Sequence, residues 1–239
     1  MTLDNILYQV TRPARYTGGE WNSLVKDWDK TYIRIVLIYP DIYEIGMSNM
    51  ALPILYELLN SQPDVLAERA YAPWVDMEAI MRTAGIPLFG LESKRPLKDF
   101  DIIGFSLGYE LTYTNVLNML HLAQIPVLAS ERDDSHPVII AGGSCALNPE
   151  PMADFIDFFA IGDGEEVLPE LLDCFRTWKG KGASKKELFH QVATIPGIYV
   201  PSLYHVEYQA DGLVKNIAPT AAQAKPTIQR QMVTELPPP

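Results

Sequence analysis

Apolar stretches that alternate with segments of helical period dominate the middle of the chain. Five such stretches each predict a strand that is buried on both faces. They lie at residues 32–40, 64–71, 101–107, 137–143 and 157–162. Strands that alternate with helices are typical of βαβ units. The pattern therefore predicts an α/β fold with a doubly wound, mostly parallel sheet of the Rossmann-like type.

The segments between these stretches predict helices with one apolar face. The expected inward residues are Leu52, Leu55, Tyr56 and Leu59 in the first helix, Tyr113, Val116, Leu117 and Leu120 in a later one, and Val167, Leu168, Leu171, Phe175 and Trp178 in the longest. A short helix is expected from Trp74 to Ala84. Asp163 and Glu166 have the spacing of a capping box at the start of the longest helix.

The pattern changes after about residue 180. A short helix near 184–192 is followed by two alternating runs around the turn Ala210, Asp211 and Gly212, which predicts a β-hairpin appended to the main sheet. We therefore divide the chain into an N-terminal arm (1–30), a Rossmann-like domain (31–180), a helix and hairpin extension (181–217) and a proline-rich linker (218–239).

Charge and composition exclude several classes of protein. The net charge of -11 disfavours a surface that attracts phosphate backbones, so we expect no direct binding of nucleic acid. No apolar run has the length of a membrane helix and no secretory signal is present, which predicts a cytoplasmic protein without a membrane partner. Cys145 and Cys174 have no closely spaced partner, and we expect both to be ordinary core residues.

Ligands of an open parallel sheet bind beyond the carboxyl ends of its strands. The first such loop contains Asp41, Tyr43 and Gly46, and the third strand leads into Ser106 and Gly108. Each loop alone has a structural explanation as a tight turn or a connection between a strand and a helix. Tyr43 would otherwise offer a flat, polar-tipped platform, while Gly108 would let a ligand approach the backbone.

The fourth and fifth strands also end in marked loops. Gly142 and Gly143 remove side chains directly after a strand, and Asn148 lies in a turn made rigid by prolines. The acidic loop GDGEE disfavours a phosphate at the following helix, whereas Glu165 is suited to accept hydrogen bonds from hydroxyls or amides. The four loops together predict a crevice for a large, neutral or amide-rich ligand.

Other site chemistries lack their sequence motifs. Neither GxGxxG nor GxxxxGK[ST] occurs, and the four histidines have no metal-like spacing. A phosphorelay receiver would carry an aspartate where Ser106 stands. No catalytic residue and no metal ligand is therefore predicted.

The motifs together resemble a known family. PARYTGGEWNS, YPDIYEIGMSN, FSLGYELTYTNVLNML and IIAGGSCALNPEPMADFIDFFAIGDGEE are similar to the N-terminal region of an uncharacterised, cobalamin-type radical SAM family. The resemblance implies a cobalamin-binding-like domain ahead of a radical SAM barrel that holds a [4Fe-4S] cluster and S-adenosylmethionine. This chain has no CxxxCxxC motif, so we expect it to be inactive alone and its partner to be its own barrel.

The resemblance also implies a set of cofactor-binding residues. Cobalamin-binding folds carry DxHxxG after the first strand, and here tyrosine replaces the histidine that would coordinate cobalt, so cobalamin would be held without that ligand. The implied set is Asp41, Tyr43, Glu44, Gly46, Ser106, Leu107, Gly108, Gly142, Gly143, Asn148, Gly162, Gly164 and Glu165.

Three functions follow as expectations. The first is a domain that positions cobalamin against the barrel, with radical methyl transfer as one outcome. The second is a Rossmann-like scaffold without a cofactor, which docks the barrel or recognises its substrate, with Tyr43 filling the space of the corrin. The third, flavodoxin-like electron transfer, is disfavoured because the first loop lacks a phosphate-binding sequence rich in Ser, Thr and Gly. The sequence does not identify the substrate.

Overall fold

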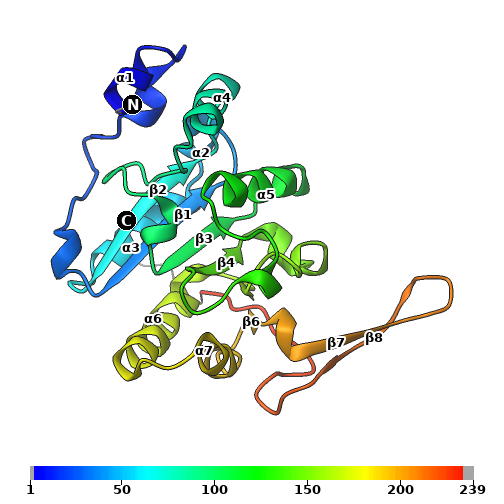
Figure 1. Cartoon of the computed structure of the whole chain (residues 1–239). Helices are drawn as coiled ribbons and strands as arrows, with labels where there is room; N and C mark the ends of the chain where they lie inside the picture. Colours follow the sequence, from blue (N-terminus) through cyan, green and yellow to red (C-terminus); the bar gives the residue numbers. More distant parts are fainter. Residues whose placement is uncertain (1–2, 234–239) are drawn as a thin grey trace. The chain divides into compact units, whose positions relative to one another are not determined.

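The computed structural model describes residues 3–233, and the chain divides into two compact units, Met1–Ile139 and Ile140–Pro239 (Figure 1). The predicted domain boundaries stay predictions.

The first unit is built from βαβ connections. Its helices and strands are α1 (Leu3–Leu7), β1 (Ile33–Tyr39), α2 (Tyr43–Gly46), α3 (Ala51–Asn60), β2 (Val65–Tyr71), α4 (Val75–Ala84), β3 (Ile102–Ser106) and α5 (Tyr113–Leu122). Strand β1 lies between β2 and β3 and pairs parallel with both, so that Ile35 is opposite Ala67 on one side and Ile102 on the other. All carboxyl ends of these three strands therefore meet at one edge, where the loops of interest begin.

The core of the first unit follows from the apolar pattern. Helix α3 buries Leu52, Tyr56 and Leu59, which lie on one face at helical spacing. Six of the seven residues of β1 are buried, as expected for a strand covered on both faces. Helix α4 ends at Gly85, whose φ of 66° is the left-handed conformation that glycine adopts without strain.

The second unit contains most of β4 (Val138–Gly142), which starts at the end of the first unit, and the elements that follow it. These are β5 (Phe158–Ala160), α6 (Gly164–Lys181), α7 (Lys185–Val192), β6 (Ile198–Tyr199), β7 (Tyr204–Tyr208) and β8 (Val214–Pro219). Strands β4 and β5 are parallel, and the two-residue β6 adds to β5 in the antiparallel sense. Strand β6 is too short to produce a recognisable period, and it is not among the predicted strands.

The predicted α/β fold class, with mostly parallel strands and a small antiparallel hairpin, is confirmed. All five predicted strands are present, and each predicted helix forms within a few residues of its expected bounds. One detail is different, because β7 and β8 form a separate two-stranded sheet rather than an extension of the main one. No helix among residues 3–233 has the length and apolar character needed to cross a bilayer.

The predicted capping box at the start of α6 is wrong. Asp163 is the N-cap residue, but its side chain makes no capping hydrogen bond and instead accepts one from the backbone NH of Val233 at 2.9 Å. A capping box does form one helix later, between Ser184 and Glu187 of α7. The Asp163 carboxylate therefore binds a residue 70 positions away instead of capping its own helix.

The segment predicted as a linker is partly ordered against the second unit. Gln231 forms a parallel β-bridge with Gly162, with backbone hydrogen bonds to Ile161 and Asp163. Residues 234–239, including the three final prolines of the predicted linker, lie outside the described residues.

Candidate functional site

The loop after β1 brings Asp41 into contact with the loop after β3. One oxygen of the Asp41 carboxylate accepts the Ile42 backbone NH at 2.7 Å, and the other accepts the Tyr109 hydroxyl at 2.9 Å. That hydrogen bond raises the pKa of Tyr109. Two of the loops singled out in the sequence are thus joined by a side-chain contact.

The hydroxyl of Tyr43 is engaged by the N-terminal arm. It donates to Oε1 of Glu20 at 2.5 Å, and the Tyr43 ring packs edge-on against Tyr71 with a centroid distance of 5.3 Å. Burial and the Glu20 carboxylate raise the pKa of Tyr43 to about 12. Tyr43 therefore stays a neutral hydrogen-bond donor at physiological pH.

Glu44 is held by two arginines of the same arm. Arg12 and Arg15 donate to its carboxylate at 2.7 and 2.8 Å. Partial burial raises the pKa of Glu44, but the hydrogen bonds from Arg12 and Arg15 outweigh it and bring it to about 2. Proline at the first position of the short 3-10 helix Pro13–Tyr16 sets the backbone that carries Arg15 toward the loop.

Gly46 is required by the protein's own packing. A Cβ at this position would lie 2.4 Å from the Tyr71 ring and 3.0 Å from Cβ of Tyr39. Gly108 also lies close to a tyrosine, since a Cβ there would be 3.1 Å from the Tyr39 hydroxyl oxygen. The side chains of Tyr39 and Tyr71 thus occupy the space that these two glycines leave open.

The remaining residues of the third-strand loop contribute little open surface. Ser106 is the last residue of β3 and is half-buried, while Leu107 is buried in the core. Ser106 lies at the expected edge of the sheet, but Leu107 points its side chain into the protein interior. The structure therefore leaves Ser106 as the polar residue of this loop nearest to the strand end.

Arg69 is the centre of a charged cluster that the sequence reasoning missed. Its guanidinium contacts Glu20 at 2.5 Å and the almost fully buried Glu92 at 2.8 Å, and it stacks over the Tyr56 ring at 5.0 Å. Burial lowers the pKa of Arg69, but Glu92, Tyr71 and Glu20 raise it above its ordinary value. The sequence does contain a sign of this cluster. Glu68 and Arg69 are charged residues inside an apolar run that predicts a buried strand, and buried charges need partners.

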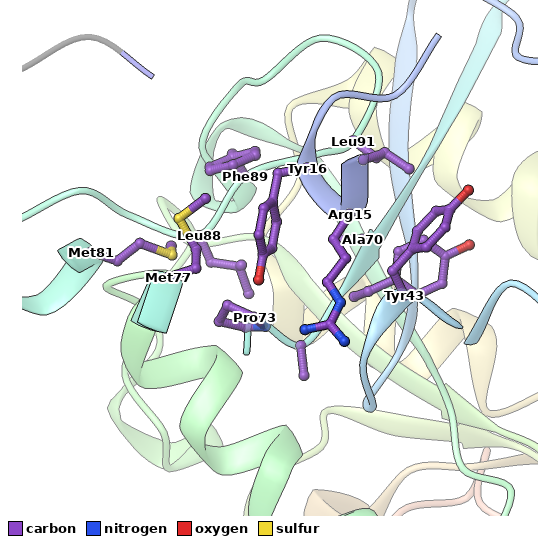
Figure 2. A pocket seen from close by; sticks show the side chains of 12 residues that line it. Arg15, Tyr16, Tyr43, Ala70, Pro73, Met77, Met81, Leu88, Phe89 and Leu91 are labelled. Carbon is purple, nitrogen blue, oxygen red and sulfur yellow. The ribbon is translucent and has the colours of Figure 1, made fainter. Parts of the chain in front are cut away.

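A small cavity lies between the arm and β2. It has a volume of about 20 Å³, which is the room that a single water needs. Figure 2 shows Arg15 between Tyr16 and Tyr43 in this cavity, with the apolar side chains of Met77 and Leu88 beyond Tyr16. Pockets for organic cofactors are commonly about 300 to 1,000 Å³, so this cavity holds none of them.

The glycines after β4 have backbone roles in the second unit. Gly142 ends β4, and a Cβ there would make an ordinary contact of 3.4 Å with the Ala160 carbonyl oxygen. Gly143 has a φ of 100° and precedes the 3-10 helix Ser144–Leu147, which ends at Asn148. The positive φ is the specific reason for glycine at position 143.

The GDGEE loop is covered by the chain's own C-terminal segment. Gly162 has a φ of 115°, and a Cβ there would lie 2.1 Å from the Gln231 carbonyl oxygen. Gly164 is the first residue of α6, and Glu165 follows it at the N-terminus of the helix. Glycine is needed at position 162 because the backbone of Gln231, and not a ligand, lies directly against it.

A wider surface hollow lies between α6 and α7 and contains none of the predicted site residues. It encloses about 480 Å³ and is lined by Asp173, Cys174, Thr177, His190, Gln191, Thr194 and Gln223. Burial, Asp173 and Glu170 raise the pKa of the Cys174 thiol, which keeps it protonated and weakly nucleophilic. Cys145 is buried as expected, whereas Cys174 is partly exposed.

Cobalamin does not fit the residues of the first loop as they stand. The Tyr43 hydroxyl is bound to Glu20, the Glu44 carboxylate to Arg12 and Arg15, and the space beside Gly46 is filled by the Tyr71 ring. A corrin facing this loop would have to displace these contacts. Among the described residues, no group of three His, Cys, Asp or Glu side chains could hold a metal ion.

Comparison with known proteins places the chain in a family. Residues 51–201, more than half of the chain, match the family described as "Radical SAM proteins, N-terminal". An uncharacterized protein of Methanocaldococcus jannaschii is 23% identical over 142 residues, which are 58% of this chain and 26% of that relative. No solved structure matches the chain. Because this match extends from α3 to β6, the chain belongs to the family of N-terminal regions of radical SAM proteins.

Proposed function

We propose that this chain is the N-terminal scaffold of a cytoplasmic radical SAM enzyme, and that it docks the catalytic part or recognises its substrate without binding cobalamin itself. The catalytic part would hold the [4Fe-4S] cluster and S-adenosylmethionine. The observation that carries the proposal is the hydrogen bond from Tyr43 to Glu20, at the position expected to face cobalt.

The surroundings of Tyr43 support the same reading. Glu20 is itself held by Arg69, which is anchored by the almost fully buried Glu92. A ligand that displaced the arm from Tyr43 would leave Glu92 and Arg69 less well compensated in a largely apolar interior. A ligand that took the place of Glu20 at Tyr43 would therefore disrupt this ion cluster.

The test uses the full-length protein that carries this domain. It is mixed anaerobically with hydroxocobalamin and desalted, and its cobalt and iron contents and visible spectrum are then measured. We expect iron to be retained with the cluster and cobalt to be absent. Stoichiometric cobalt with a corrin spectrum would overturn the cofactor-free function.

A second measurement tests the radical SAM part of the proposal. The same preparation is reduced with dithionite in the presence of S-adenosylmethionine, and release of 5′-deoxyadenosine is followed. We expect release in the intact protein and none when the cluster cysteines downstream of this chain are replaced by alanine. The absence of release from the intact, iron-loaded protein would contradict this assignment.

A further inference from the structure

A group of large apolar side chains is left exposed beyond the carboxyl ends of β1 and β3. Four follow β1, through α2 and into α3, and two follow β3. They are Ile45, Met47, Met50, Ile54, Tyr109 and Leu111, which we call the methionine patch. Single exposed apolar residues are ordinary on a protein surface, but six that follow the carboxyl ends of two paired strands indicate an interaction site.

Hydrogen bonds hold the two segments that carry the patch beside each other. Tyr109 donates its hydroxyl to Asp41, and Asn115 at the start of α5 donates to the Pro40 carbonyl oxygen at 2.9 Å. At the start of α3, the backbone NH of Ile54 donates to the Met50 carbonyl oxygen, so these two residues are one helical turn apart. Figure 1 shows α2 and α5 near the same end of the strands, as these bonds require.

The chemistry of the patch suits a protein partner. Met47 and Met50 have unbranched, polarizable side chains that adapt to an apolar surface. Leu111 is 84% exposed, and Tyr109 offers a ring beside a polar hydroxyl. The patch is bordered by the carboxylates of Asp41 and Glu110, so the partner should present an apolar surface with basic residues at its edge.

We propose that the methionine patch is the surface on which the catalytic part of the same radical SAM protein docks. This inference rests on the proposed function. The chain matches only 26% of the length of its Methanocaldococcus jannaschii relative, and most of that relative lies outside the matched region. A tethered partner has a high effective concentration, so even a weak contact at this patch would hold it.

Methionine oxidation tests the proposal inside one molecule. Met47 and Met50 are 50% and 71% exposed in this chain, and Met232, at 60%, serves as the exposed reference outside the patch. Met77 and Met119 are buried. The full-length protein is treated with dilute hydrogen peroxide, and sulfoxide formation is followed by peptide mass spectrometry. We expect Met47 and Met50 to oxidise at least about fivefold more slowly than Met232, because a docked partner excludes the oxidant.

Two variants of the full-length protein sharpen this test. Leu111→Glu places a charge in the patch, and Met47 and Met50 should then oxidise within about twofold of Met232. Val25→Glu changes an equally exposed apolar residue of the N-terminal arm, and it should leave the protection intact. Protection that persists in Leu111→Glu would contradict docking on this patch.

The outcomes separate this inference from the proposed function. Fully reactive Met47 and Met50 in a protein that still cleaves S-adenosylmethionine would overturn the docking surface alone. Retained cobalamin would overturn the cofactor-free function, and the loss of protection in Leu111→Glu would then decide the docking surface by itself. Protection that disappears on dilution would show that a second copy of the protein covers the patch, and it would also overturn the proposal.

Discussion

The Tyr43 hydroxyl donates a hydrogen bond to the Glu20 carboxylate across 23 positions of sequence, and so links the first loop of the sheet to the N-terminal arm. Replacement of Tyr43 by phenylalanine removes this bond and keeps the ring against Tyr71. We expect Tyr43→Phe to lower the free energy of unfolding by about 1.5 to 3 kcal/mol, the range for a bond to a charged group. Urea unfolding measures it, and Tyr8→Phe at an exposed position should change almost nothing.

Replacement of Arg69 should strongly destabilise the first unit. Burial raises the pKa of Glu92 even with Arg69 beside it, which indicates how poorly the carboxylate would tolerate losing its partner. We expect Arg69→Met to lower the free energy of unfolding by about 3 to 5 kcal/mol. The matched control is Lys215→Met, which breaks the exposed pair with Glu207. We expect Lys215→Met to lower the free energy of unfolding by less than about 1 kcal/mol. A loss equally small for Arg69→Met would contradict the role of the cluster.

Glu44 should make the stability of the chain acid-sensitive. Its pKa in the folded protein is about 2, below its ordinary value of 4.5, so the folded state binds a proton less readily than the unfolded chain. The stabilisation is therefore present above about pH 4.5 and is lost as the pH falls toward 2. Because the Glu44 side chain is 37% exposed, we expect at most about 1 kcal/mol.

The measurement for Glu44 compares thermal unfolding of the wild type and Glu44→Gln across this range. The wild type should be more stable at pH 7, and the difference should shrink steadily as the pH falls from about 4.5 to about 2. A difference that stays constant with pH would show that the two arginines do not distinguish the charged carboxylate from its amide.

Two glycines of the predicted site make a matched pair. An alanine at position 46 would press its methyl group into the Tyr71 ring, whereas one at position 142 would make an ordinary contact. We expect Gly46→Ala to lower the free energy of unfolding by about 1 to 3 kcal/mol and Gly142→Ala to change it by less than about 1 kcal/mol. Chemical denaturation of the two variants checks this, and similar losses at both positions would argue against the role of Tyr71.

The Asp163 carboxylate should control the order of the segment that crosses the GDGEE loop. In Asp163→Ala, the Val233 NH loses its acceptor, while the Gln231 NH keeps the Ile161 carbonyl oxygen. We expect hydrogen exchange to accelerate at the Val233 amide and to change little at Gln231. Equal acceleration at both amides would mean that the whole segment detaches.

Most of the fold was predictable because most of its elements, unlike the two-residue β6, carry their own pattern. The strand starting at Ile33 and the helix burying Leu52, Tyr56 and Leu59 follow from local apolar period alone. The contacts of the loops were not predictable in this way. Glu20 and Tyr43, or Asp163 and Val233, are far apart in sequence, and no local pattern shows that one takes up the polar group of the other.

The site residues illustrate the same limit. Glycines at strand ends indicate that another group comes close to the backbone, but they do not show whether that group is a ligand or part of the chain. At Gly46 it is Tyr71, and at Gly162 it is the backbone of Gln231. At both positions long-range packing determines that the chain itself fills the space, which no local pattern of residues indicates.

The ammonium of Lys26 donates to the backbone carbonyls of Asn60, Gln62 and Val65, at 2.7, 2.7 and 2.6 Å. These three oxygens converge only when the turn between α3 and β2 has its final shape. A single side chain of the arm therefore holds the end of α3 and the start of β2 together, so the turn and the arm stabilise each other.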